Sequence, residues 1–230
     1  EVAVLFRRYG MVSAGVVDPQ ERLVGMITND DVIDVIDEEA EEDLLALAGV
    51  GDANLRSGLW ETLQGRSSWL FINLLTAVLA SVVIGLFEAT IERLVALAVL
   101  MPIVASMGGN AGTQTMTVAV RAIALRQLDA TATRQFVLRE LIVATTNGLL
   151  FAVLAAGLSY LWFGDPEIAI VMAVAMMANL LVAGLSGTFV PVGLMRAGVD
   201  PAVASSVFVT TITDVVGFFV FLGLAALYLM

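Results

Sequence analysis

One carboxylate occupies the middle of a long apolar stretch near the C-terminus. From Ala202 to Met230 the only ionisable side chains are those of Asp214 and Tyr228, and Asp214 lies within the segment TTITDVVGFF. An ionised side chain at the centre of a membrane helix costs about 3 kcal/mol or more, and such residues usually mark an ion path. A protonated Asp214, or one paired with an arginine, is the alternative, which we disfavour because no arginine is expected at that depth.

The residues before Asp214 predict the helix that carries it. Asp200-Pro201 is typical of a helix start, with Asp as the N-cap and Pro at the first helical position. Asp214 follows about 21 Å further along the axis, close to four turns, so Asp200 and Asp214 share a face. Thr210 and Thr211 lie near the same stripe. We therefore expect a small, polar face that points away from lipid.

A second candidate is the segment PIVASMGGNAGTQTMT, residues 102–117. Gly108, Gly109 and Gly112 would loosen a helix and expose carbonyls, which membranes tolerate only in backbone that is buried in protein or lines a wet cavity. Close helix packing is the alternative, since Gly108 and Gly112 form a small-xxx-small pair. The polar neighbours, which favour a polar lining, are Asn110, Thr113 and Gln114.

The third candidate is the acidic segment DDVIDVIDEEAEED, residues 30–43, which holds nine carboxylates. Like charges four residues apart on a helix each cost a few tenths of a kcal/mol. A solvated acidic face is the usual explanation of such a run. The other explanation is bound divalent cations, and a ligand set made only of oxygen suits Mg²⁺ or Ca²⁺.

Composition limits the class of protein. The chain of 230 residues is 59% hydrophobic, with a mean hydropathy of +0.94, which indicates a polytopic membrane protein. A net charge of −11 argues against a nucleic-acid partner and favours a cationic one. Cysteine and histidine are absent, and no nucleophile–base pair is evident, so we do not expect an enzyme.

Apolar windows predict an all-α membrane fold with five transmembrane helices, at about 68–88, 92–120, 136–163, 167–195 and 202–229. We expect the second to be broken by MGGNAGTQT and the fourth by Gly184, Gly187 and Pro191. Residues 1 to about 62 predict a soluble strand–turn–strand–helix unit with its turn at Asp18-Pro19. Arginines concentrate on one side of the spans, which predicts a cytoplasmic N-terminus and an external C-terminus.

These segments resemble the MgtE family of magnesium channels. MPIVASMGGNAGTQTMTVAVRA is similar to its second transmembrane helix, and NLLVAGLSGTFVP and DPAVASSVFVTTITDVVGFF are similar to the fourth and fifth. AGVVDPQERLVGMITNDDVIDVI resembles the end of a second CBS domain, and EEAEEDLLALAGV the plug helix after it. The resemblance implies a CBS remnant at 1–30, an acidic connecting helix at 31–65 and a five-helix pore domain at 66–230. Family members normally carry more cytosolic sequence before this point, so we expect a fragment.

The resemblance also implies roles for individual residues. Asp214 matches the pore aspartate that binds hydrated Mg²⁺, and Thr210 lies one turn before it. Gly108, Gly109, Asn110 and Gly112 match the pore-lining motif. The acids that match a regulatory Mg²⁺ site, which closes the pore, are Asp31, Asp34, Glu39, Glu42, Asp43 and Asp200.

We therefore expect a homodimeric Mg²⁺ channel or transporter of the cell (inner) membrane, surrounded by lipid, with its pore on the dimer axis and Mg²⁺ as substrate and regulator. One alternative is an ion-coupled divalent cation exporter that uses Asp214 as its carrier site. Another is a transporter of broader selectivity that also carries Co²⁺. A third is a magnesium sensor or a membrane enzyme that does not transport.

Overall fold

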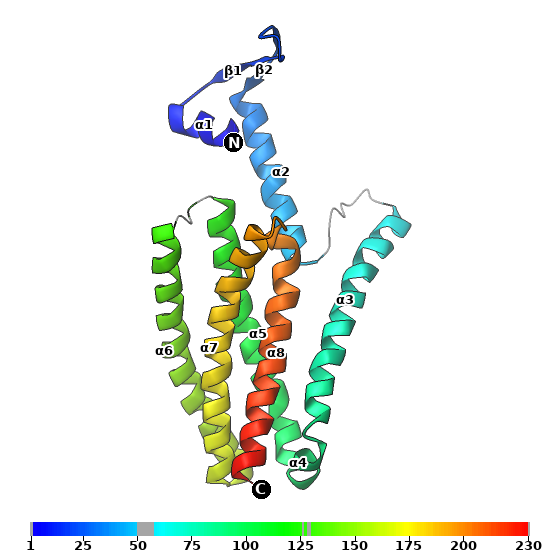
Figure 1. The fold of residues 1–230 in the computed structure, drawn as a ribbon, viewed down its shortest axis with the longest axis vertical. Coiled ribbons are helices and arrows are strands. Elements are labelled where there is room, and N and C mark those ends of the chain that lie inside the picture. Colours follow the sequence, from blue (N-terminus) through cyan, green and yellow to red (C-terminus); the bar gives the residue numbers. More distant parts are fainter. Residues whose placement is uncertain (1, 50–57, 126, 128–129, 230) are drawn as a thin grey trace.

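The computed structural model describes residues 2–49, 58–125, 127 and 130–229. A long helical bundle carries a smaller N-terminal part at one end (Figure 1). The elements are α1 (Val2–Tyr9), β1 (Ser13–Val17), β2 (Leu23–Thr28), α2 (Asn29–Leu47), α3 (Leu59–Gly85), α4 (Glu88–Arg93), α5 (Val95–Ala124), α6 (Ala130–Phe163), α7 (Pro166–Arg196) and α8 (Pro201–Tyr228). Five of these helices, α3 and α5 to α8, are long and apolar enough to cross a membrane, which confirms the predicted number of spans.

The expected breaks in two of the spans are wrong. Helix α5 continues through Gly108–Gly112, and α7 continues through Gly184, Gly187 and Pro191. The glycines instead allow close approach between helices, because a Cβ atom on Gly187 would lie 2.6 Å from the carbonyl oxygen of Gly112. A Cβ atom on Gly184 would similarly lie 2.7 Å from the Cβ atom of Ala144 on α6. The packing interpretation therefore accounts for these glycines.

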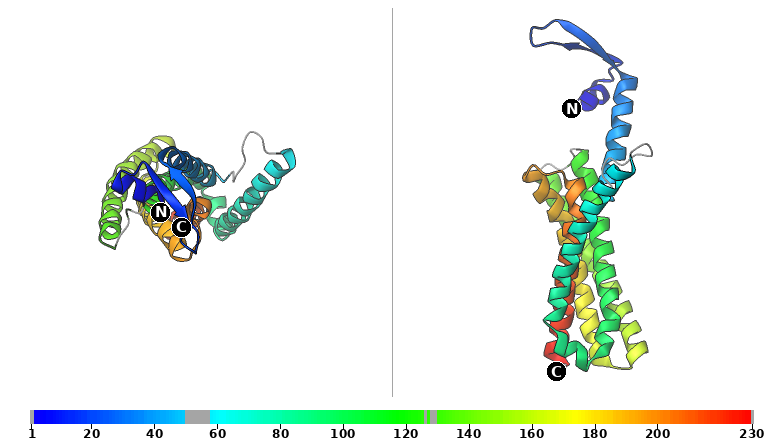
Figure 2. Two further views of the ribbon diagram at one scale, coloured as in Figure 1. Left: turned by 90° about the horizontal axis from the view of Figure 1, so that it is seen from above. Right: turned by 90° about the vertical axis from the view of Figure 1, so that its right-hand side faces the viewer.

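Helix α7 lies at the centre of the bundle, and α3 lies at its periphery. In α7, 56% of an apolar window of 18 residues is buried, whereas in α3 the buried share of the corresponding window is 6%. Helices α5, α6 and α8 all pack on α7, and α8 also contacts α5 and α3. The N-terminal end of α3 leans away from the other spans in both side and top views (Figures 1 and 2). The apolar core therefore lies among α5, α7 and α8, around residues such as Val104, Met176 and Phe221.

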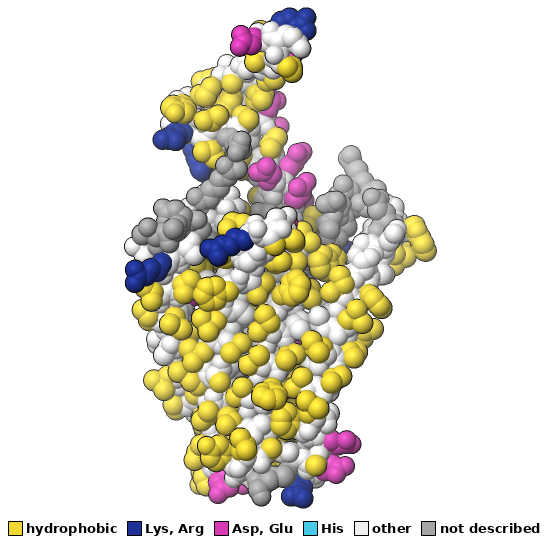
Figure 3. All heavy atoms as spheres, in the orientation of Figure 1, with side chains coloured by type: hydrophobic (Ala, Val, Ile, Leu, Met, Phe, Trp, Pro, Cys, Tyr) yellow, Lys and Arg dark blue, Asp and Glu magenta, His cyan; other side chains and the backbone are white. Residues whose placement is uncertain are grey.

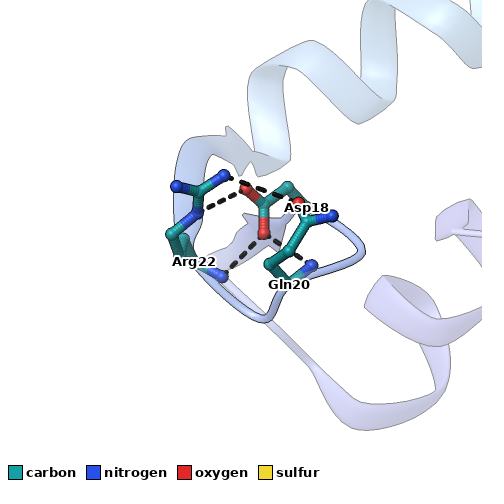
Figure 4. Close-up of polar contacts among 3 residues, drawn as sticks. All are labelled: Asp18, Gln20 and Arg22. Carbon is teal, nitrogen blue, oxygen red and sulfur yellow. Dashed lines mark hydrogen bonds and ion pairs between the residues drawn. The ribbon is translucent and has the colours of Figure 1, made fainter.

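The N-terminal part contains the predicted strand–turn–strand–helix order. Strands β1 and β2 pair antiparallel, and Asp18 closes the turn between them, as expected (Figure 4). Its carboxylate accepts hydrogen bonds from the backbone N–H groups of Gln20 and Arg22 and from the Arg22 side chain, each at 2.9 Å. The bond from the Arg22 backbone is the main cause that holds the pKa of Asp18 below its ordinary value. Helix α1 was not predicted.

Helix α2 connects the hairpin to the bundle. At its start, the backbone N–H and the hydroxyl of Thr28 donate to the Asp31 carboxylate at 2.8 and 2.7 Å. At its end, Ala46 and Leu47 pack against a small cluster on α5 and α8. The cluster consists of Met116, Val120, Ala202 and Val209. The acidic helix is therefore anchored beside the start of α8.

Candidate functional site

The two segments singled out inside the membrane lie side by side. A Cβ atom on Gly109 of α5 would lie 3.9 Å from the Thr210 methyl group on α8. A Cβ atom on Gly112 would lie 2.6 Å from a methyl group of Val209. Asp214 follows Thr210 by one helical turn and is partly buried. The structure thus brings the glycine segment of α5 to the face of α8 that leads to Asp214.

Asp214 makes no hydrogen bond or ion pair with any residue that the structure describes. The hydroxyls before it are used within their own helix: Thr210 donates to the Ser206 carbonyl at 2.9 Å, and Thr211 donates to that of Val207 at 2.6 Å. Each hydroxyl donates its single proton to a backbone carbonyl. This part of α8 therefore offers oxygen acceptors and a carboxylate.

A polar stripe runs along the outward face of α5. Its four exposed members, spaced by three or four residues as on one helix face, are Ser106, Asn110, Thr113 and Thr117. Thr113 donates to the Gly109 carbonyl at 2.8 Å, and the Asn110 amide donates to Ser106 at 3.4 Å. This stripe presents acceptor oxygens, as α8 does, and it lies on a helix of membrane-spanning length.

Gly108 and Gly112, which the resemblance assigns to a pore lining, are buried against neighbouring helices. Gly108 lies against Asn179 of α7, whose Cγ atom would be 2.8 Å from a Cβ atom on this glycine. A Cβ atom on Gly217 of α8 would lie 2.8 Å from the Asn179 amide nitrogen. In this chain, the exposed polar face of the segment therefore belongs to Asn110 and Thr113, and the two buried glycines make the helix contacts.

The predicted regulatory acids do not form a metal site within one chain. Asp34, Glu39 and Glu42 are exposed along α2, and the side chain of Asp43 lies outside the described residues. Asp31 forms a capping box with Thr28 at the start of α2, and Asp200 caps α8 by accepting from the Ala202 backbone N–H at 2.8 Å. In the described ranges, no group of three or more acidic, histidine or cysteine side chains is placed to hold a metal.

Sequence reasoning missed two polar residues that join helices. Asn179 of α7 is completely buried, and its amide nitrogen donates to the Val104 carbonyl of α5 at 2.8 Å. Glu140 of α6 accepts a 2.9 Å hydrogen bond from the hydroxyl of Thr115 on α5. Asn179 is an isolated amide in a strongly apolar span, and that signal could have identified it. Glu140 was obscured by the arginines around it in the sequence.

The fold defines a polytopic α-helical membrane protein. Its spans carry the polar stripe of α5 and, on α8, the carboxylate of Asp214, which has no partner among the described residues. Residues 101–224 match the MgtE family, described as a divalent cation transporter, and the chain belongs to that family.

Three relatives illustrate the similarity. The magnesium transporter MgtE of Thermus thermophilus is 38% identical over 232 residues, and that of Bacillus subtilis is 32% identical over 230 residues. Each alignment covers 100% of this chain and 51% of the relative. The magnesium transporter MgtE of Enterococcus faecalis is 29% identical over 229 residues, with the same coverage. The chain therefore spans about half the length of the curated relatives it matches.

Proposed function

We propose that this chain is the membrane part of a magnesium transporter in which two copies surround one pore. The observation that carries the proposal is the exposed polar stripe of α5, whose neighbour Gly109 faces Thr210 of α8, one turn before Asp214. Hydrocarbon offers such a stripe no hydrogen bonds, so it requires water or another protein surface. A second copy related by a two-fold axis would enclose it and bring two Asp214 carboxylates to one path. The names of the relatives support Mg²⁺ as the substrate.

The chemistry of the stripe suits a hydrated divalent cation. Mg²⁺ gives up its waters reluctantly and usually keeps several of them in protein sites. Those waters point their hydrogens outward, toward the acceptor oxygens that Thr113, Thr210 and Thr211 retain after donating to the backbone. Two Asp214 carboxylates together balance the charge of one Mg²⁺. The threonine oxygens would thus hold the ion through its waters, and the two Asp214 carboxylates would neutralise its charge.

The charge distribution supports an orientation. Arginines of the bundle gather at the end nearer α2, whereas the opposite end shows acidic side chains next to a basic one (Figure 3). The α2 end is therefore proposed to be cytoplasmic and the C-terminus external. In a cell (inner) membrane, the potential would supply about 2.3 kcal/mol per charge per 100 mV, and so about 4.6 kcal/mol for Mg²⁺ entering.

A regulatory role for α2 is part of the proposal. Its last turn packs beside the start of α8, and Asp200 caps that helix. Cytosolic Mg²⁺ would neutralise the acidic side chains of α2 and hold this contact, which keeps the pore closed. The acids concerned are Asp34, Glu39, Glu42 and Asp43, together with Asp31 and Asp200, whose carboxylates also serve as caps.

Uptake of Mg²⁺ into reconstituted vesicles tests the pore assignment. Asp214→Asn removes the charge at nearly constant volume and is expected to reduce uptake at least about tenfold, because it removes the counter-charge of the ion. Tyr228→Phe is the matched control, since Tyr228 is the other ionisable residue of the same helix and is exposed near its end. Undiminished uptake in the Asp214 variant would refute the assignment.

The same vesicles separate the alternative functions. Uptake that requires a proton or sodium gradient would favour the ion-coupled carrier. Equal uptake of Co²⁺ would favour broader selectivity, and no flux with retained Mg²⁺ binding would favour a sensor.

A further inference from the structure

A polar pocket lies between α5, α6 and α7, apart from the α5–α8 face. Its volume is about 210 Å³, and its polar lining comes from Gln114 and Thr115 on α5 and from Glu140 and Asn147 on α6. Leu180 and Gly184 of α7 also line it. Thr115 lies toward the C-terminal end of α5 and Glu140 toward the start of α6, so the pocket is in the half of the bundle nearer α2 (Figure 1).

Among the described residues, the carboxylate of Glu140 has no ion-pair partner. Its one hydrogen bond comes from the Thr115 hydroxyl, at 2.9 Å, and no arginine is paired with it among the residues that the structure describes. The adjacent Arg139 is exposed and belongs to a different face of α6, because consecutive helical residues point about 100° apart. A partly buried carboxylate on a helix of spanning length needs a partner, since its desolvation is costly.

The other polar groups of the pocket supply the ligands that a hard cation prefers. Asn147 follows Glu140 by seven residues, close to two turns, so both side chains lie on the same face of α6. Gln114 and Asn147 line the pocket and carry amide oxygens, and the Thr115 oxygen keeps lone pairs after donating its proton. One carboxylate with three neutral oxygens is a donor set for a hard cation.

The charge of the pocket selects the valence of the ion. A single carboxylate is neutralised by one positive charge, whereas a divalent ion would leave one positive charge uncompensated. The volume corresponds to roughly seven waters at about 30 Å³ each, which accommodates a cation with part of its hydration shell. We propose that this pocket binds Na⁺ through Glu140, with Thr115, Gln114 and Asn147 as neutral ligands. The bound ion would tie α6 to α5.

Binding of ²²Na⁺ to the full chain in lipid nanodiscs tests this site. The wild type is expected to bind one ²²Na⁺ per chain saturably and to melt at higher temperature in NaCl than in choline chloride of equal ionic strength. Glu140→Gln keeps the size of the side chain and an acceptor for Thr115, and should weaken binding at least about tenfold. Asn147→Leu keeps the carboxylate, and we expect it to weaken binding by a smaller factor.

Two control variants test whether the loss of ²²Na⁺ binding is specific to Glu140. Glu88→Gln removes an exposed acid of α4 at the opposite end of the bundle, and Asp214→Asn removes the carboxylate of the proposed pore. Both should leave ²²Na⁺ binding and the NaCl effect unchanged, so this test does not depend on the proposed function. The proposal is overturned if the wild type binds no ²²Na⁺ saturably, if Glu140→Gln binds it normally, if Asp214→Asn abolishes it, or if Mg²⁺ occupies the same site more tightly.

Discussion

The side-chain amide of Asn179 on α7 donates a 2.8 Å hydrogen bond to the backbone carbonyl of Val104 on α5. This bond crosses a core of apolar side chains and joins the central helix to the helix that carries the polar stripe. Gly108 and Gly217 leave room for the amide, since a Cβ atom on either would come within 3 Å of it. One buried amide thus lies where α5, α7 and α8 meet.

The first prediction concerns that amide. Asn179→Ala removes the bond and leaves a small cavity, so we expect it to destabilise the protein by about 1–3 kcal/mol. Thermal unfolding of the purified protein measures the change. Asn73→Ala on the exposed face of α3 is the control and should leave the melting temperature unchanged. Equal melting temperatures for the two variants would contradict the role assigned to Asn179.

The second prediction separates glycines that contact a neighbouring helix from those that do not. A Cβ atom on Gly112 would lie 2.6 Å from Val209, whereas one on Gly157 of α6 would meet nothing within 4 Å. Gly112→Ala should therefore cost about 1–3 kcal/mol and reduce Mg²⁺ uptake, because it separates α5 from α8. Gly157→Ala should be neutral or slightly stabilising. Normal stability and uptake in Gly112→Ala would show that the contact is dispensable.

The third prediction ranks two crowded glycines by what they touch. A Cβ atom on Gly187 would lie 2.6 Å from the Gly112 carbonyl oxygen, and one on Gly148 would lie 2.6 Å from the sulfur of Met177. A methionine side chain can move aside, but a helix backbone can yield only by shifting the helix. We expect Gly187→Ala to lower the melting temperature much more than Gly148→Ala. The reverse order would mean that the α5–α7 contact is loose.

The fourth prediction concerns pH at the start of α2. The backbone N–H of Thr28, and next its hydroxyl, lower the pKa of Asp31 from its ordinary value of 3.8. Because the pKa is depressed in the folded state, the contribution of Asp31 to stability is present above the unfolded value and is lost as pH falls through the folded value. Thr28→Val removes the hydroxyl and should move the carboxyl titration, followed by NMR, toward 3.8, whereas Thr28→Ser should not. Identical titrations in both variants would exclude the hydroxyl as a cause.

Local signals in the sequence predicted local structure well. The caps at Asp200 and the turn at Asp18 were confirmed, because each depends on a side chain that bonds the backbone within a few residues. Glycine was misread in α5 and α7, because its intrinsic tendency to loosen a helix was given more weight than helix packing. The roles of Asp214 and of the acids of α2 stay predictions, because each depends on an ion or on a second copy of the chain.

The sequence by itself determined the five membrane spans, the cap of the last one and the unusual carboxylate at Asp214, because apolar length and local charge depend only on neighbouring residues. Only the tertiary structure decided which helices lie opposite one another. Asn179 bonds a carbonyl 75 residues away, and Glu140 bonds a hydroxyl 25 residues away. Such pairings follow from the packing of whole helices, which no local pattern specifies, and they create both the buried amide and the pocket at Glu140.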